Sequence, residues 1–153
     1  MKLFSCIIFS LGVLFSTMAQ DKNQQLYEAI LKSDVATVEK LVLAGADVNY
    51  IKELSATLKV SMLIAAVDHT NIQITKLLLS KKANVHWKDG FNTTAIMYAA
   101  LSGDLAVVKL LVENGANVKD SDGKGNTVLS AAKESENAEL ITYVDQKVKA
   151  SGQ

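Results

Sequence analysis

The chain contains no arginine and no proline, and its 153 residues include one cysteine and two histidines. Cys6 lies in the apolar stretch at the N-terminus, so the rest of the chain has no thiol for a disulfide or for nucleophilic catalysis. The absence of arginine removes the side chain best suited to bidentate binding of phosphate and guanine. Sixteen lysines balance sixteen carboxylates, so the chain lacks the excess positive charge typical of nucleic-acid-binding proteins. We therefore expect no nucleic-acid partner.

The supply of catalytic and metal-binding groups is equally small. Only His69 and His86 could act as imidazole bases, and two histidines without cysteine fall short of a zinc site. The stretch "DSDGKGN" at 120–126 resembles the start of a calcium loop, but it lacks the glycine placement and the terminal glutamate of that motif. We expect no catalytic residue, no metal and no cofactor. A hydrolase or a metal-dependent enzyme is the alternative from a different functional class.

The first nineteen residues, "MKLFSCIIFSLGVLFSTMA", have the features of a secretory signal peptide. Lys2 gives a basic start, an apolar stretch follows, and Thr17 and Ala19 occupy the −3 and −1 positions of a cleavage site before Gln20. We expect export to a periplasm or out of the cell, with no membrane contact after cleavage. An uncleaved N-terminal anchor is the alternative, although the apolar stretch is short and wrongly flanked for a membrane span.

The remainder of the chain repeats itself. Polar residues separated by 37, 33 and 33 positions recur at Asp34, Asn71, Asp104 and Asn137. The same intervals connect Leu41, Leu78, Leu111 and Val144. The short motif "GADVN" at 45–49 returns as "KANVH" at 82–86 and as "GANVK" at 115–119. A fixed period near 33 residues is typical of a solenoid built from stacked supersecondary units.

Each unit has the pattern of an antiparallel helix pair. The recurring Asp and Asn are good helix N-caps, and the segment "LAVVKLLVEN" places apolar residues on one helical face. Gly45 and Gly115 suit a left-handed residue after the helix, whereas Lys82 at the same place predicts strain or a different helix ending. A shorter alanine-rich helix precedes each cap, with Thr94 and Thr127 as expected N-caps. Polar links with Asp-Gly turns predict a hairpin between units.

The third unit, "DGFNTTAIMYAALSGDLAVVKLLVENGANVK" at 89–119, resembles the ankyrin repeat, whose pattern is "T-P-L-H-x-A-A-x-x-G-H-…-V-V-x-L-L-…-G-A-D-V-N". The resemblance covers essentially all of the chain after residue 19. It implies an all-α solenoid of about four stacked helix pairs joined by β-hairpin-like loops. We place a repeat domain at residues 20–153, with the first and last repeats as caps. The expected repeats span about 22–49, 50–86, 87–119 and 120–148.

The sequence departs from the ankyrin pattern at the start of the shorter helices. The proline position falls at Ser61, Ala95 and Val128, and the histidine position at Leu63, Met97 and Ser130. Loss of the histidine predicts a looser hydrogen-bond network at these turns. His86 stands where the pattern ends in asparagine, so we expect it at a structural joint, and His69 falls in a solvated turn.

The second unit is longer than the others, because Ala46 and Ala83 lie 37 residues apart. Alignment with its neighbours assigns about three of the added residues to the hairpin at 50–59 and one to the turn at 68–71. Loops tolerate insertions at small entropic cost and often carry function. The expansion is therefore either a functional loop or neutral drift.

The resemblance implies that a protein partner is held in a concave groove, formed by the hairpin tips and the exposed ends of the shorter helices. The positions that map to this groove are Tyr50, Ile51, Val67, Asp68, Lys88, Phe91, Thr93, Leu101, Ser102, Ser121, Lys124 and Glu134. Aromatic and apolar side chains in a polar hairpin are typical of binding hot spots. We expect Phe91 to contact the partner and Trp87 to pack as core, and the reverse assignment is the alternative for each.

The sequence thus predicts an exported, monomeric, non-catalytic module that binds another protein through its groove. An adaptor or protective partner of another exported protein is favoured, because the near-neutral groove lacks the strong acidity of nuclease inhibitors. An inhibitor or immunity protein that neutralises a toxin or hydrolase is the alternative. Self-association through exposed hairpins is the third.

Overall fold

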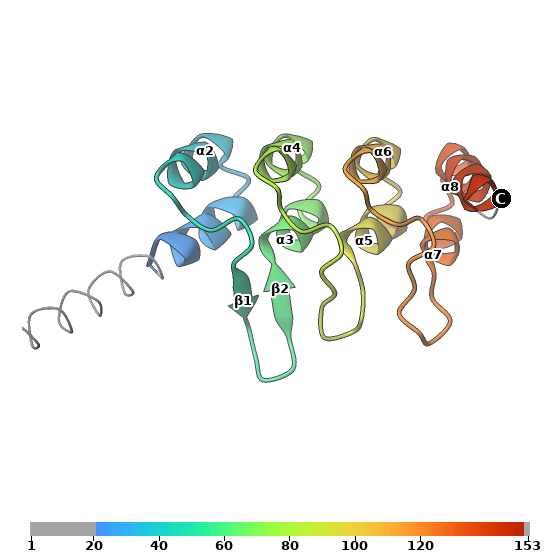
Figure 1. Cartoon of the computed structure of the whole chain (residues 1–153), viewed down its shortest axis with the longest axis horizontal. Helices are drawn as coiled ribbons and strands as arrows, with labels where there is room; N and C mark the ends of the chain where they lie inside the picture. Colours follow the sequence, from blue (N-terminus) through green and yellow to red (C-terminus); the bar gives the residue numbers. More distant parts are fainter. Residues whose placement is uncertain (1–20, 152–153) are drawn as a thin grey trace, which may run out of the picture.

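The fold is a row of helix pairs joined by projecting hairpins, seen in a computed structural model that describes residues 21–151 (Figure 1). The expected signal peptide, residues 1–19, lies outside the described residues. Four outer helices form one layer: α2 (Val35–Leu43), α4 (Ile72–Ser80), α6 (Leu105–Glu113) and α8 (Ala138–Ala150). The inner helices form the second layer: residues 21–31, α3 (Met62–Asp68), α5 (Ala95–Leu101) and α7 (Val128–Glu134). The predicted helical solenoid is confirmed, and α8 is longer than the other outer helices, with 13 residues against 9.

The recurring polar residues begin the outer helices, as the sequence predicts. Asp34, Asn71 and Asp104 each accept a hydrogen bond at 3.0 Å from the backbone N–H three residues ahead, and Asn137 accepts two at 3.1 Å. Each cap satisfies a backbone donor that the helix cannot satisfy, which is worth about 1 kcal/mol. The period of the sequence is therefore a period of helix starts.

The inner helices begin in three different ways. Thr127 and Ser130 form a reciprocal capping box, in which each hydroxyl accepts from the backbone N–H of the other. Ser61 accepts from the N–H of Ile64 at 3.1 Å. Thr94 occupies the N-cap position of α5 without a side-chain bond, and its buried hydroxyl has no hydrogen-bond partner within the described residues. The looser network expected at these turns is thus confirmed in the third repeat and wrong in the fourth, where Ser130 provides the bond.

Three of the outer helices, α2, α4 and α6, are followed by a left-handed residue. The backbone dihedral φ is +85° at Gly45 and +94° at Gly115, and Lys82 adopts the same conformation with φ +65°. A side chain in this region costs roughly 1–2 kcal/mol because its Cβ approaches the following carbonyl oxygen. The strain predicted at Lys82 is therefore present.

The motif "GADVN" forms the joint between repeats. Its alanine and valine are buried in each repeat, as Ala46, Ala83, Ala116, Val48, Val85 and Val118. The side chain of Asn49 accepts from the N–H of Asn84 at 2.8 Å and donates to the carbonyl of Lys82 at 3.2 Å, so it spans two repeats. His86 holds the equivalent place in the next repeat, where it is exposed at the predicted joint.

The added residues of the second repeat lie entirely in its hairpin, which corrects the predicted division. Ser61 caps α3, so it corresponds to Thr94 and Thr127 and not to the proline position. Ala46 and Ser61 are 15 residues apart, whereas Ala83 and Thr94 are 11 apart. The turn after α3 has the same length as its equivalents, with a left-handed residue at Thr70, Gly103 and Glu136. The cap rule itself favours this placement, because serine is a good N-cap and Val60, the cap under the shifted alignment, is a poor one.

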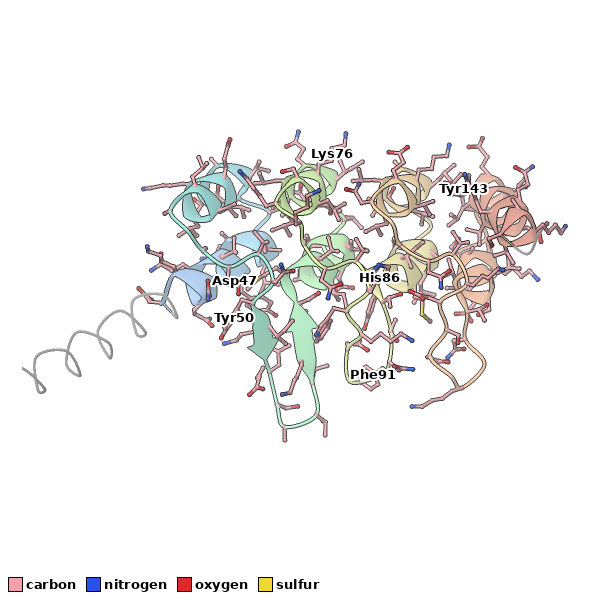
Figure 2. All side chains as sticks on the ribbon, in the orientation of Figure 1. Asp47, Tyr50, Lys76, His86, Phe91 and Tyr143 are labelled. Carbon is pink, nitrogen blue, oxygen red and sulfur yellow. The ribbon has the colours of Figure 1, made fainter. Side chains whose placement is uncertain are left out.

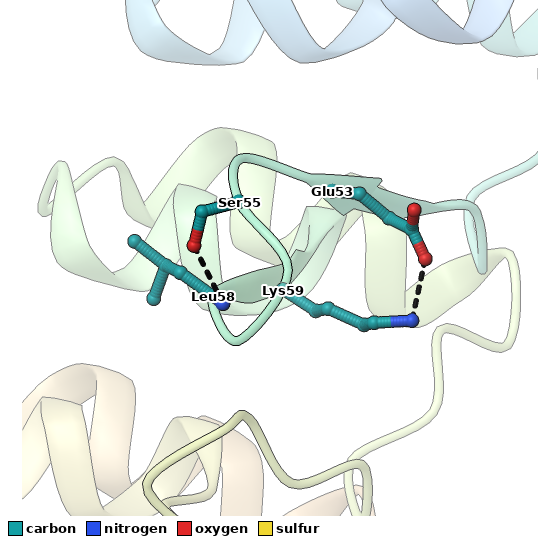
Figure 3. A network of polar contacts seen from close by, with 4 residues as sticks. All are labelled: Glu53, Ser55, Leu58 and Lys59. Carbon is teal, nitrogen blue, oxygen red and sulfur yellow. Dashed lines mark hydrogen bonds and ion pairs between the residues drawn. The ribbon is translucent and has the colours of Figure 1, made fainter.

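The longer hairpin contains the two strands of the described residues, β1 (Ile51–Glu53) and β2 (Lys59–Ser61). They pair antiparallel with Ile51 opposite Ser61 and Glu53 opposite Lys59. Figure 3 shows the Glu53–Lys59 ion pair across the strands and the bond from the Leu58 N–H to the Ser55 hydroxyl near the tip. The insertion therefore produces a regular, self-bonded hairpin.

The tip of this hairpin lies against the next one. A Cβ atom at Gly90 would overlap the backbone carbonyl oxygen of Thr57, so only glycine fits at this approach. Leu54, close to the tip, is 47% exposed. Adjacent hairpins are thus in backbone contact as well as adjacent in sequence.

Candidate protein-binding groove

A pocket of about 280 Å³ opens between the third and fourth repeats. Its walls come from α5, from α7 and from the hairpins that precede them, which we call the third-repeat hairpin (residues 87–94) and the fourth-repeat hairpin (residues 119–127). The lining residues, which we call the groove, are Phe91, Thr93, Met97, Tyr98, Leu101, Asp122, Asn126, Ser130, Ala131 and Glu134. The groove therefore coincides with the third- and fourth-repeat part of the predicted binding face.

The third-repeat hairpin is organised around a buried carboxylate. Asp89 is 8% exposed, and one of its oxygens accepts from the backbone N–H groups of Phe91 and Thr93, both at 2.9 Å. Its other oxygen accepts from the Tyr98 hydroxyl at 2.7 Å. Burial, followed by this bond to Asp89, raises the pKa of Tyr98 well above its ordinary value, so the phenol stays protonated as the donor. The carboxylate thereby fixes the hairpin on α5.

The fourth-repeat hairpin is also organised around a buried carboxylate, which accepts from different donors. One oxygen of Asp122 accepts from the backbone N–H groups of Lys124 at 2.7 Å and Asn126 at 3.1 Å, and the other accepts from the Asn126 amide at 2.6 Å. The backbone bond from Lys124 is the largest cause of the lowered pKa of Asp122. The stretch that resembles the start of a calcium loop is therefore the hairpin turn between the third and fourth repeats.

The two hairpins are also bonded to each other. The amide of Asn92 donates to the Asp122 carbonyl at 2.9 Å, and the ammonium of Lys88 donates to the Ser121 carbonyl at 3.0 Å. Each hairpin is therefore held by its own carboxylate and by its neighbour. Such a wall needs little further ordering when a partner binds.

Four of the twelve predicted contact residues line the groove: Phe91, Thr93, Leu101 and Glu134. Phe91 is 59% exposed and Leu101 is 50% exposed, which is unusual for large apolar side chains. Figure 2 shows Phe91 on the projecting hairpin, whereas Lys76 and Tyr143 lie on the outer helices. The exposure of Phe91 agrees with its predicted role but does not test it.

The other predicted contacts divide into two groups. Asp68, Lys88, Ser102 and Lys124 are exposed but do not line the pocket. Tyr50, Ile51 and Ser121 are half-buried. Tyr50 and Trp87 both pack against the hydrophobic core, as we expected for Trp87. The structure thus brings together only the third- and fourth-repeat part of the predicted face.

The prediction that Val67 contacts a partner is wrong. Its side chain is 2% exposed, so it belongs to the core and cannot contact a partner. The error follows from the one-residue shift at Ser61, because with Ser61 as N-cap Val67 corresponds to the buried Ala100. Asp68 then becomes the counterpart of Leu101 and Glu134.

Six groove residues were missed from the sequence: Met97, Tyr98, Asp122, Asn126, Ser130 and Ala131. Helical spacing could have found two of them, since Met97 and Tyr98 lie four and three residues before Leu101 on the same face. The role of Asp122 carries no such signal, because it depends on how its loop closes.

The family described as "Ankyrin repeats (3 copies)" matches residues 26–122 and, in a second overlapping match, residues 62–150. The chain belongs to the ankyrin repeat family. It is also 31% identical over 90 residues to an ankyrin repeat protein of Acanthamoeba polyphaga mimivirus, an alignment that covers 56% of each chain. The chain therefore spans little more than half the length of that relative.

Membership of the family indicates a general activity. Ankyrin repeats indicate a protein–protein interaction module, and the family is a non-catalytic binding scaffold. Within residues 21–151, no three acidic, histidine or cysteine side chains are grouped so as to hold a metal ion. In the same range, no helix combines the length and the apolar character needed to cross a bilayer.

Proposed function

We propose that this chain is exported and binds another exported protein non-covalently through the groove, as an adaptor or protective partner. The single observation that carries the proposal is the pair of exposed apolar side chains, Phe91 and Leu101, at the edge of a preformed pocket. Burying one such side chain against a partner is worth about 1.5–3 kcal/mol. Few other large apolar side chains of residues 21–151 are as exposed.

The rigidity of the groove supports a binding role. The backbone around Phe91 is held by Asp89 and the neighbouring hairpin, so the aromatic ring is presented on a fixed loop. Binding energy is then not spent on ordering the loop. Aromatic residues on a fixed support are typical interface anchors.

Export rests on the N-terminal sequence. The basic start, apolar stretch and small-residue end of residues 1–19 favour cleavage before Gln20 and delivery to a periplasm or to the exterior. The test is the N-terminal peptide of protein recovered from the exported fraction, read by mass spectrometry. A mature chain that starts at Gln20 supports export, whereas an intact Met1 in the cell pellet contradicts it.

The binding test is a pull-down from the native exported fraction with three baits. The wild type is compared with the double variant Phe91→Ala, Leu101→Ala and with the control Leu43→Ala. Leu43 is 72% exposed on α2 and lies outside the groove, so it controls for general loss of apolar surface. We expect one protein that the wild type and the control retain and the double variant loses.

The captured protein then decides the role. An adaptor or protective partner leaves its target active in the complex, whereas an inhibitor abolishes that activity. Equal capture by all three baits would place the interface elsewhere on the chain. A molecular mass that rises with concentration, measured by light scattering on the bait alone, would contradict the monomer and point to self-association.

A further inference from the structure

We infer that the partner segment held by the groove is basic, with an apolar side chain next to lysine or arginine. This inference rests on the proposed function, because it names the chemistry of the partner at the same site. The observation that carries it is a largely apolar pocket whose lining includes two carboxylates and no lysine.

The apolar part of the groove accepts a large side chain. Phe91, Met97 and Leu101 line it from the hairpin and from α5. The volume of about 280 Å³ exceeds the roughly 150 Å³ that is known to hold a benzene ring. A leucine, methionine or aromatic side chain of the partner therefore fits, with room for part of its backbone.

Negative charge gathers around this pocket. Asp122 and Glu134 are part of the lining. Asp89 accepts a hydrogen bond from Tyr98, another lining residue, and Asp68 is the last residue of α3, which packs against α5. The groove is therefore surrounded by acidic side chains, although the whole chain is neutral.

The nearby lysines only partly offset this charge. Lys124 acts on Asp122, whose pKa its charge helps to lower, and Lys88 is bonded to the Ser121 carbonyl. Neither lysine lines the pocket. Asp122 is buried and bonded within its loop, so a cation that enters the groove meets the carboxylate of Glu134.

Asp68 and Glu134 are the residues whose charge remains available to a partner. Within residues 21–151, neither side chain takes part in a salt bridge, and the groove offers Glu134 no cationic neighbour. They occupy equivalent positions as the last residues of α3 and α7, where the helix dipole disfavours a negative charge. These negative charges do not stabilise the helix ends, but they can attract a cation. Leu101 stands at the same position between them and supplies the apolar contact.

The test begins with a defined probe, a random twelve-residue peptide library displayed on phage and selected on protein recovered from cells that express the full chain. Enriched peptides are synthesised with a fluorophore, and their Kd is measured by anisotropy. We expect enriched sequences in which a large apolar residue adjoins Lys or Arg. Enrichment of neutral or acidic sequences, or of no sequence, overturns the inference.

Charge reversal gives the matched comparison. In Asp68→Lys, Glu134→Lys we expect the Kd of a selected peptide to rise at least about tenfold, because two attractions become repulsions. The control Glu39→Lys, Glu113→Lys changes the net charge equally at exposed positions on outer helices, and we expect less than about a twofold change. Equal weakening in both variants shows a general charge effect and overturns the inference.

The same variants separate failure of this inference from failure of the proposed function. If Phe91→Ala, Leu101→Ala loses the partner in the pull-down while Asp68→Lys, Glu134→Lys retains it, the groove binds a partner of other chemistry. The proposed function then stands and the basic segment is wrong. If neither variant loses the partner, both fall.

Discussion

The second-repeat hairpin, which contains β1 and β2, and the third-repeat hairpin stabilise a projecting loop in different ways. Both project from the helix layers (Figure 1). The second uses a strand ladder, with β1 and β2 exchanging backbone bonds and an ion pair across them. The third has no strand and closes around the buried Asp89. A ladder needs length, which the insertion supplies, whereas a carboxylate can organise a short loop and leave Phe91 exposed.

The comparison predicts that removing the central carboxylate has the largest effect. Asp89→Ala leaves two backbone N–H groups and the Tyr98 hydroxyl without their acceptor. We expect the free energy of unfolding, measured by urea denaturation, to fall by about 3 kcal/mol. Asp47→Ala is the control, because Asp47 is exposed and its carboxylate accepts only from Asn49. A similar loss in both variants would contradict the special role of Asp89.

The contact between the two hairpins gives the second prediction. In Gly90→Ala the new methyl group meets the Thr57 carbonyl oxygen, so one hairpin must move, and we expect a loss of about 2 kcal/mol. Deleting residues 54–57 shortens the second hairpin to the standard period and removes the obstacle. In that background, Gly90→Ala should be nearly neutral by urea denaturation. A persistent loss would mean that the strain lies within the third-repeat hairpin itself.

Tyr98→Phe tests one bond of the third-repeat hairpin. The variant keeps the ring and removes the hydroxyl that donates to Asp89, while the two backbone donors remain. We expect a loss of about 1–1.5 kcal/mol in the same denaturation assay. The backbone amide signals of Phe91 and Thr93 in an NMR spectrum should shift little, because the loop still closes. Large shifts at both amides would show that Tyr98 is needed for closure.

The smallest expected effect is the response to salt and pH of two carboxylates, Glu53 in the strand ladder and Asp122 at the centre of the fourth-repeat hairpin. The pKa values of Glu53 and Asp122 are both lowered, the first mainly by its side-chain bond to Lys59 and the second mainly by the backbone N–H of Lys124. A lowered carboxyl pKa adds stability above the unfolded pKa near 4, and this is lost as pH falls through the folded pKa.

An NMR titration of both carboxylates at about 0.05 M and 0.5 M NaCl measures the difference. We expect added salt to weaken the shift at the exposed Glu53–Lys59 pair and to leave most of the shift at Asp122, whose donors are fixed in the loop. Equal loss of both pKa shifts would contradict the distinction between the exposed ion pair and the carboxylate held by backbone N–H groups.

Prediction succeeded where the determining contacts are local. The helix starts at Asp34, Asn71 and Asp104 need only a side chain and a backbone N–H three residues away, so a single position carries the information. At Lys82 the same local pattern left two outcomes, strain or a different helix ending, and the structure shows the strained left-handed one. The shift at Ser61 was an avoidable error, because serine is also a good N-cap and its bond to the Ile64 N–H is equally local.

In the groove, too, some features could be predicted from the sequence and others could not. Phe91 and Leu101 were assigned to the groove because the resemblance to ankyrin repeats places a binding face there and the repeat period maps it onto these positions; the period also indicated the helix pairs and the joints. Whether Val67 is buried, whether Tyr98 reaches Asp89 nine residues earlier, and whether Asn92 reaches Asp122 in the next repeat are different questions. Only the tertiary structure decided them, because hydrogen bonds and burial between separate segments depend on distances that a one-dimensional period does not contain.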